Sequence, residues 1–275
     1  MAGALGHRAS GALDLDSQFS RPLEAVRQRD PVRGRGGGVR LDDAEGVEPR
    51  RNGRPVVDRA QRVRDPPERL GLPDRLRDDD PEAVREPEPL RRIAQALRAI
   101  HNGPPIPARF DAFRVVEAYA ATATAHGIAL PDGFERAREL AVEVERARGA
   151  VPERPCHNDL LTSNLIDDGT RIRIVDWEYA GMGDVFFDLA NFAVNNGLPA
   201  PDTAEFLHAY YGTVTPEQER ALTLMRFMSD FREAMWGVVQ QALSDLDFDF
   251  AAYAQQHFER LERTAGERAF RRALA

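Results

Sequence analysis

The chain has 275 residues, of which 42% are hydrophobic, and it carries a formal net charge of −8. This acidic balance disfavours nonspecific binding to nucleic acid or to an anionic membrane, and the single cysteine excludes an internal disulfide framework and fits a reducing cytoplasm. Because no apolar run approaches the roughly 18 residues of a membrane-spanning helix and the N-terminus lacks the apolar core of a signal peptide, we expect a cytoplasmic protein without nucleic-acid or membrane partners.

Residues 1–92 differ sharply from the rest of the chain in composition. They contain no Ile, Thr, Tyr, Trp or Lys and a single phenylalanine, Phe19, and they are rich in Arg, Asp, Pro and Gly. Such a segment cannot bury enough apolar surface to offset its chain entropy. We therefore predict two parts: a low-complexity segment over 1–87 that is disordered, poorly packed or not the native lobe, and a folded lobe over 88–275. The glycine-rich stretch at 33–43 lacks the last glycine of a phosphate-binding fingerprint and is interpreted as a flexible loop.

Helical patterns begin at residue 88. Apolar residues share one face of a predicted helix that ends near Asn102, and two more helices are expected over 110–127 and 132–149. Beyond residue 200, two further helix starts are predicted from capping boxes, the first at Asp202 with Glu205 and the second at Thr215 with Gln218. A last helix is expected over 250–264.

Between these helices lies the segment CHNDLLTSNLIDDGTRIRIVDWEYAGMGD, residues 156–184. Apolar residues alternate with arginines over 171–174, and the Asp-Gly pair at 168–169 is a strong hairpin signal. We expect antiparallel strands over 165–166 and 172–175. Such a hairpin brings the loop before it next to the loop after it, so Asp159, Asn164 and Asp176 can converge.

These three side chains suit phosphoryl transfer. A hard divalent cation prefers oxygen ligands and usually takes only one or two from the protein, which Asn164 and Asp176 supply, while Asp159 remains to accept the proton of an attacking hydroxyl. The spacing His157-x-Asp159-x-x-x-x-Asn164 matches the catalytic-loop pattern of protein-kinase-like enzymes, in which Asp is the base and Asn binds magnesium. Loop aspartates are often only turn formers, but a loop, a hairpin and a second aspartate in this order favour a catalytic origin.

The stretches HNDLL, IVDWEYAGMGD and FFDLANFAVNNG resemble the choline/ethanolamine kinase family, within the wider aminoglycoside-phosphotransferase-like group. The resemblance covers about residues 88–250, which correspond to the larger C-terminal lobe of that family. It implies an α+β, protein-kinase-like C-terminal lobe that is mostly helical, with a short β-hairpin at the catalytic loop. It also implies ATP- and Mg²⁺-dependent phosphorylation of a small alcohol, most simply choline or ethanolamine.

By this resemblance, the catalytic residues are Asp159, as the base, and His157, which we interpret as hydrogen-bonded support for the loop rather than as a proton shuttle. Asn164 and Asp176 are the metal ligands that the family implies. Asp188 resembles the helix aspartate that braces the backbone of the catalytic loop.

Choline carries a quaternary ammonium that cannot form a hydrogen bond at nitrogen, so its pocket is expected to use aromatic faces and carboxylates. We predict that Tyr179 and Trp236, with Glu178 and Glu233, bind a cationic small-molecule alcohol. For the aromatic residues, the simpler interpretation is core packing, and Glu178 could equally pair with an arginine.

A kinase of this type also needs an N-terminal lobe with a phosphate-binding loop and a strand-borne basic residue. The first part of the chain offers no such strand, and the chain has no lysine, so that lobe is predicted to be absent, degenerate or disordered and the nucleotide-binding residues stay unassigned. Two alternatives are open: another small-molecule kinase of the group, acting on an aminoglycoside, thiamine or an amino sugar, and an inactive pseudokinase-like ligand-binding protein. A shifted reading frame of a GC-rich gene would explain the composition of residues 1–87.

Overall fold

The computed structural model describes residues 82–275. The predictions for the N-terminal segment, namely its disorder, the missing lobe, the shifted reading frame and the flexible loop at 33–43, lie outside the described residues. Val84, which precedes the predicted boundary at residue 88, is fully buried within the described part. The domain boundary at residue 88 stays a prediction. No helix of this part is both long enough and apolar enough to cross a membrane.

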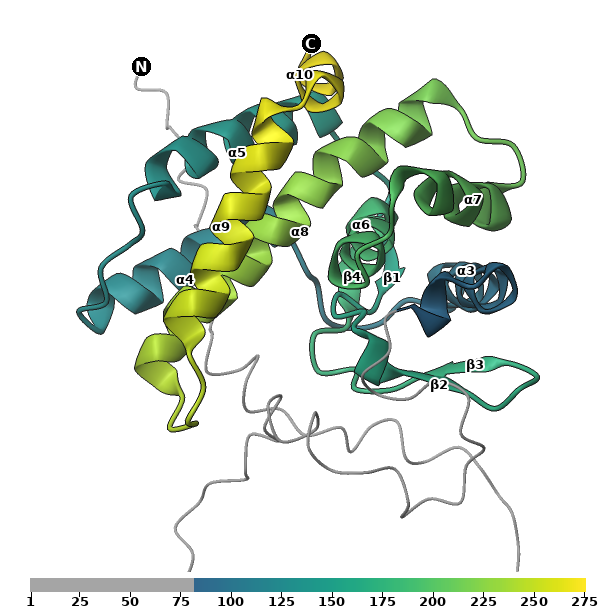
Figure 1. The fold of residues 1–275 in the computed structure, drawn as a ribbon, viewed down its shortest axis with the longest axis horizontal. Helices are drawn as coiled ribbons and strands as arrows, with labels where there is room; N and C mark the ends of the chain where they lie inside the picture. Colours follow the sequence, from purple (N-terminus) through teal and green to yellow (C-terminus); the bar gives the residue numbers. More distant parts are fainter. Residues whose placement is uncertain (1–81) are drawn as a thin grey trace, which may run out of the picture. The chain divides into compact units, whose positions relative to one another are not determined.

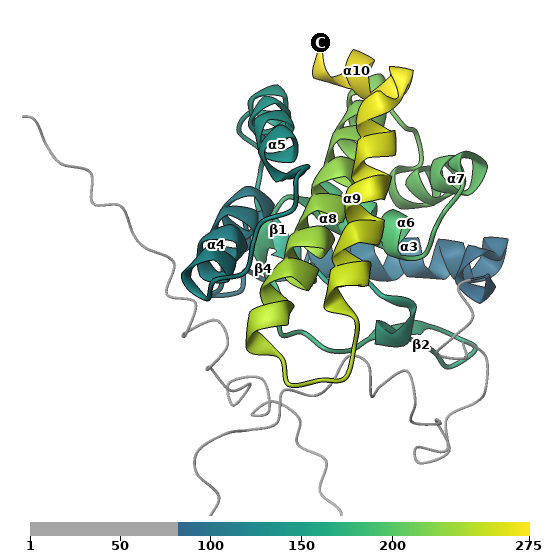
Figure 2. The ribbon, with the colours of Figure 1, turned by 60° about the vertical axis from the view of Figure 1, so that its left-hand side comes forward.

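The lobe is built around one long helix, α8 (Pro216–Leu243), whose middle is buried on every face. Its 28 residues correspond to a length of about 42 Å. Helices α4 (Ala112–Ala125), α6 (Val185–Asn195) and α9 (Phe250–Gly266) pack against it, and Figures 1 and 2 both show α9 running alongside α8. Because α8 contacts helices on several sides, it forms the centre of the hydrophobic core.

The remaining helices surround this centre. Helix α3 (Pro87–His101) packs against α7 (Ala200–Tyr211), and α5 (Phe134–Arg148) and the short α10 (Arg268–Leu274) contact α8. The helices predicted near 88–101, 110–127, 132–149 and 250–264 are confirmed with small shifts at their ends. Helix α10 had no counterpart among the predicted elements.

The two predicted capping boxes have different outcomes. At the start of α8, Thr215 accepts a hydrogen bond from the backbone N–H of Gln218, and the Gln218 side chain accepts one from the N–H of Thr215, which confirms the second box. The N-cap predicted at Asp202 is wrong, because the N-cap of α7 is Pro199, three residues earlier. Proline at the second helical position has no N–H to leave unsatisfied, so the helix can start ahead of it.

Two small antiparallel sheets lie within residues 154–183. Strand β2 (Leu165–Asp167) pairs with β3 (Ile172–Ile174), which confirms the hairpin, although its loop has four residues rather than two. Strand β1 (Arg154–Cys156) pairs with β4 (Gly181–Gly183), which the sequence did not predict. A Cβ atom on Gly181 would lie 2.8 Å from the backbone nitrogen of Phe110, so the absence of a side chain allows this close approach.

Candidate active site

Asp188 anchors the backbone of the loop that follows β1. This residue lies in α6, is fully buried, and accepts hydrogen bonds from the backbone N–H groups of His157 (2.7 Å) and Asn158 (2.6 Å). The Nε2 atom of His101 lies 2.9 Å from the same carboxylate, and its Nδ1 atom lies 2.6 Å from the hydroxyl of Tyr210. The loop is therefore tied to α6, α3 and α7 through one carboxylate.

Electrostatics favours the charged form of this carboxylate. Burial alone would raise the pKa of Asp188, but the His101 side chain and the backbone N–H of His157 together lower that pKa below its ordinary value. Next to it, burial raises the pKa of the Cys156 thiol far above its usual range, and the charges of Asp188 and Asp184 act in the same direction. Cys156 is therefore a buried neutral thiol, as expected for a small apolar residue.

The His157 ring connects the loop to the segment after β3. Its Nδ1 atom accepts a hydrogen bond from the backbone N–H of Asp159 (3.3 Å), which leaves Nε2 to donate to the carbonyl of Val175 at 2.9 Å. The ring also makes an edge contact with Trp177, with centroids 4.9 Å apart. Because both ring nitrogens are engaged within the protein, the geometry suits structural support rather than proton transfer.

The three residues predicted to converge lie on backbone segments that are joined by hydrogen bonds. The Nδ2 atom of Asn164 donates to the carbonyl of Asp159 at 2.8 Å and lies 3.4 Å from its Oδ2 atom. The backbone carbonyl of Asn164 accepts from the N–H of Val175 at 3.0 Å, so Asp176 follows directly on the segment beside Asn164. The hairpin thus brings the loop and Asp176 together, as its register requires.

Two residues of this region have positive φ angles although they are not glycine. Asn158 has φ 67° and Asp176 has φ 68°, a conformation that Asn and Asp tolerate better than other residues. The side chain of Asn158 holds its own turn by donating to the carbonyl of Tyr179 at 3.0 Å. Such backbone strain is often concentrated at functional sites.

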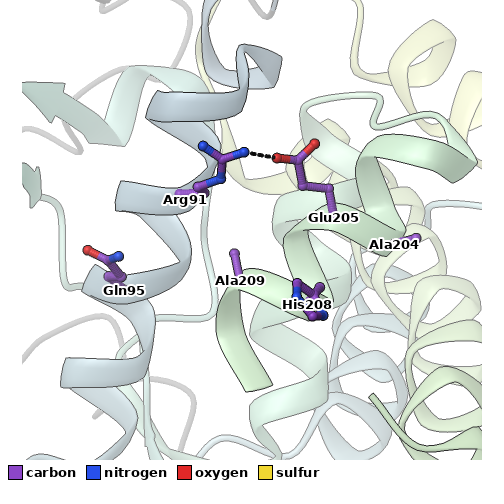
Figure 3. A pocket seen from close by; sticks show the side chains of 6 residues that line it. All are labelled: Arg91, Gln95, Ala204, Glu205, His208 and Ala209. Atoms are coloured by element: carbon purple, nitrogen blue, oxygen red, sulfur yellow. Dashed lines mark hydrogen bonds and ion pairs between the residues drawn. The ribbon is translucent and has the colours of Figure 1, made fainter. Parts of the chain in front are cut away.

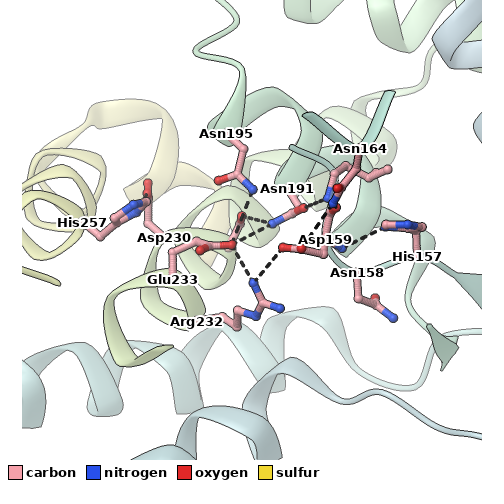
Figure 4. A network of polar contacts seen from close by, with 12 residues as sticks. His157, Asn158, Asp159, Asn164, Asn191, Asn195, Asp230, Arg232, Glu233 and His257 are labelled. Carbon is pink, nitrogen blue, oxygen red and sulfur yellow. Dashed lines mark hydrogen bonds and ion pairs between the residues drawn. The ribbon is translucent and has the colours of Figure 1, made fainter. Parts of the chain in front are cut away.

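A buried polar network extends from Asp159 into α8 (Figure 4). The Nη1 atom of Arg232 lies 2.7 Å from Glu233 Oε1 and 3.4 Å from Asp159 Oδ1, and its guanidinium stacks on the Tyr179 ring at 4.6 Å. Burial would lower the pKa of Arg232, but the charges of Glu233, Tyr119 and Asp159 raise it well above its ordinary value. A fixed positive charge therefore lies beside the predicted base.

Glu233 is the centre of this network. It is fully buried, its Oε1 atom lies within 3.5 Å of donors on Arg232, Asn191 and Asn195, and its Oε2 atom accepts a hydrogen bond from the Tyr253 hydroxyl at 2.7 Å. Asn191 in turn accepts a hydrogen bond from the backbone N–H of Leu160 at 2.6 Å. This carboxylate is hydrogen-bonded by the protein itself, and through Asn191 it is linked to the catalytic loop.

The other predicted substrate residues lie in different surroundings. Trp236 is 7% exposed and packs edge-on against Phe250 and Tyr253. Tyr179 is half-buried beneath Arg232, and Glu178 is exposed. Their roles in substrate binding stay predictions.

Sequence reasoning did not identify Arg232, Asn191 or Tyr253. One signal for Arg232 was present in the sequence: a charged Arg-Glu pair at 232–233 interrupts the middle of a helix that is otherwise apolar on several faces. Charged residues are rarely buried unless they are paired, so that pair indicated a buried network. The contacts of Asn191 and Tyr253 depend on tertiary packing alone.

A surface cavity lies elsewhere, between α3 and α7 (Figure 3). It has a volume of about 470 Å³, and an ion pair between Arg91 and Glu205, with atoms 2.9 Å apart, spans it. Gln95, Ala204, His208 and Ala209 complete its lining, so it shares no residue with the network around Asp159.

Sequence similarity relates this chain to known proteins. Residues 65–223 match the sequence model of the Phosphotransferase enzyme family. Ethanolamine kinase 2 of Homo sapiens is 31% identical over 210 residues, which cover 65% of this chain and 54% of that protein. The chain therefore spans about half the length of this curated relative.

Solved structures show the same fold. A choline/ethanolamine kinase family protein from Mesorhizobium loti superposes with a TM-score of 0.67 at 28% identity, covering 74% of this chain and 71% of that chain. A structure of LicA in complex with AMP superposes with a TM-score of 0.55 at 21% identity, covering 67% of this chain and 65% of that chain.

These similarities confirm the protein-kinase-like fold and the resemblance to choline and ethanolamine kinases that the sequence motifs predicted. The match to the family covers more than half of the chain and includes the whole catalytic loop and hairpin. The chain belongs to the phosphotransferase enzyme family.

Proposed function

We propose that this protein transfers a phosphoryl group from ATP, with Mg²⁺, to the hydroxyl of a small molecule, and that the acceptor is choline or ethanolamine. The observation that carries the proposal is the hydrogen-bonded junction of Asp159, Asn164 and the segment leading to Asp176, on a loop whose backbone is held by Asp188. Ethanolamine kinase 2 supports the acceptor class, and the AMP bound to LicA supports an adenine nucleotide as the donor.

Each residue of the junction has a role in this proposal. Asp159, which is 4% exposed, accepts the proton of the acceptor hydroxyl as that oxygen attacks phosphorus. The amide nitrogen of Asn164 is engaged with Asp159, which directs the amide oxygen away from that residue. This oxygen and the Asp176 carboxylate are hard donors of the kind that Mg²⁺ prefers, and they would hold the cation. When bound there, the cation would neutralise part of the charge on the phosphates.

The ammonium end of the acceptor is assigned to the aromatic group formed by Trp236, in the C-terminal part of α8, and by Phe250 and Tyr253 at the start of α9. Trp236 lies 5.7 Å from Phe250 and 5.5 Å from Tyr253, measured between ring centroids, and Phe248 is 42% exposed beside them. Aromatic faces attract an alkylammonium that cannot donate a hydrogen bond. The Tyr253 hydroxyl donates to the buried carboxylate of Glu233, whose charge is paired with Arg232.

The proposal is tested with the full chain in two steps. Calorimetry with Mg-ATP measures nucleotide binding, and a coupled ADP assay then compares choline and ethanolamine with an aminoglycoside, thiamine and an amino sugar. We expect turnover with choline or ethanolamine and a loss of about 10²–10⁴-fold in kcat for Asp159→Asn, with ATP affinity retained. The exposed Asp132→Asn serves as the matched control, because Asp132 lies far from the loop in the sequence and is exposed.

Two results would count against the proposal. If Mg-ATP shows no binding at millimolar concentration, the kinase proposal fails for this chain. If Asp159→Asn turns over like the wild type, Asp159 is not the base.

A further inference from the structure

Asn158 connects the loop that carries the predicted base to the segment after Asp176. Its backbone N–H donates to Asp188 at 2.6 Å, which fixes the residue to α6. Its Nδ2 atom donates to the carbonyl of Tyr179 at 3.0 Å and lies 3.4 Å from the carbonyl of Cys156. Because two carbonyl oxygens lie near this atom, the amide must present its nitrogen to them. One side chain therefore bridges the two segments that the proposed chemistry requires together.

Asparagine is unfavourable at this position in two respects. Its φ angle is 67°, a left-handed backbone conformation that glycine adopts at lower cost. Its Oδ1 atom is buried and has no hydrogen-bond partner among the described residues, which is also destabilising. Glycine would avoid both costs but would lack the hydrogen bond to Tyr179. The net gain from one hydrogen bond is about as large as either cost alone, so stability by itself does not favour asparagine here.

The bridge to Tyr179 matters because of what the ring of that residue contacts. The ring lies against the Arg232 guanidinium at 4.6 Å, and the Nη1 atom of Arg232 lies 3.4 Å from Oδ1 of Asp159. Asn158 directly precedes Asp159 in the chain. A closed path thus runs from the Asn158 amide through the ring and the guanidinium to the carboxylate, and the backbone completes it. Such supporting contacts restrict the orientation of a reactive side chain.

We propose that Asn158 is a positioning residue for the transfer reaction, because its bridge keeps the Asp159 carboxylate oriented to accept the proton of the acceptor hydroxyl. In that step the acceptor oxygen forms a bond to the γ-phosphorus of ATP as its proton passes to Asp159. The bond from phosphorus to the bridging oxygen breaks, and ADP leaves with the electron pair. In this role Asn158 contacts neither acceptor nor nucleotide and transfers no proton. The inference rests on the proposed function, but the bridge itself can be measured without turnover.

Two variants remove the bridging donor in different ways. Asn158→Gly suits the left-handed backbone but has no side chain, whereas Asn158→Asp keeps the shape but has only acceptor oxygens when ionised. They share the loss of the N–H donor, so we expect kcat to fall about 10–100-fold in both, with the KM for ATP within about twofold of the wild type. Nucleotide-binding sites are counted by calorimetry and kcat is expressed per site, so that a smaller folded fraction does not lower it.

The matched control for these variants is Asn102→Gly. Asn102 is an exposed asparagine whose Nδ2 atom donates to the carbonyl of Arg98 at 2.7 Å. The substitution removes the same kind of hydrogen bond at a position outside the catalytic loop. It should keep the wild-type kcat.

The bridge is measured by amide hydrogen exchange on the full chain without nucleotide. The Ala180 N–H donates to the Trp177 carbonyl at 3.2 Å, in the turn that contains Tyr179. Its exchange should be about fivefold to tenfold faster in Asn158→Gly than in the wild type, because one hydrogen bond no longer holds the turn. Asn102→Gly should leave it unchanged. Equal exchange at Ala180 in Asn158→Gly and the wild type would overturn the inference.

The kinetic outcomes are also decisive. Wild-type kcat per site in either Asn158 variant would show that the donor is not needed and would overturn the positioning role. If only one variant folds, that variant decides, and if neither folds, Asn158 serves the fold and the inference fails. If the wild type transfers no phosphoryl group to any acceptor, the proposed function fails, whereas faster exchange at Ala180 in Asn158→Gly would still establish the bridge.

Discussion

Replacement of Asp188 by asparagine is expected to destabilise the fold and to remove part of its acid sensitivity. The carboxylate accepts backbone hydrogen bonds from His157 and Asn158 and contacts His101, at distances of 2.6–2.9 Å. Asparagine keeps one acceptor oxygen, but its NH₂ group faces a donor, so one buried N–H loses its partner and the ionic part of the other contacts is lost. At about 1–3 kcal/mol for an unsatisfied buried group and a similar amount for the lost charge, the cost is about 2–6 kcal/mol.

The pH dependence gives a second, independent readout. Because the pKa of Asp188 is lowered in the folded state, its stabilisation is fully present above its unfolded pKa of about 3.9 and is lost as the pH falls through the folded pKa. The difference in unfolding free energy between wild type and Asp188→Asn should therefore shrink as the pH is lowered below about 4. Other carboxylates titrate in both proteins, so they cancel in this difference.

Urea unfolding followed by circular dichroism, at pH 7 and at steps down to pH 3, measures both effects. Asp132→Asn, at an exposed position, should stay within about 0.5 kcal/mol of the wild type. The reasoning is refuted if Asp188→Asn also stays within that range at pH 7, or if its loss of unfolding free energy relative to the wild type is the same at pH 3 as at pH 7.

The remaining predictions concern two tightly packed positions. Gly181→Ala should lower the free energy of unfolding by about 1–3 kcal/mol, because its Cβ would lie 2.8 Å from the backbone nitrogen of Phe110. The control Gly266→Ala has open space around the new Cβ and should be neutral or slightly stabilising. Equal urea midpoints for the two variants would contradict this account. Cys156 should not react with a thiol reagent such as DTNB in the native state, because burial keeps its thiol pKa far above the usual range, and it should react fully in urea. Rapid labelling of the native protein would show that β1 opens or that the thiol is accessible.

Local signals in the sequence determined a large part of the fold. The helix at Thr215 begins where its capping box and proline place it, since an N-cap depends only on residues within one turn. The Asp-Gly pair and the alternating residues after it determined the hairpin, and the hairpin in turn determined that the loop carrying Asp159 and Asn164 meets the segment before Asp176. The start predicted at Asp202 failed because two prolines allow the helix to begin earlier.

The tertiary structure alone decided how the loop is held and what surrounds its base. Asp188 and His101 are separated by 87 residues, and Arg232 and Asp159 by 73, so no periodicity or capping rule relates them. Their contacts arise because α3, α6 and α8 pack against the same loop. The cost of burying these charged side chains is offset only when partners from distant elements meet. Sequence identifies residues that can do this chemistry, whereas packing determines which of them share a low-dielectric site.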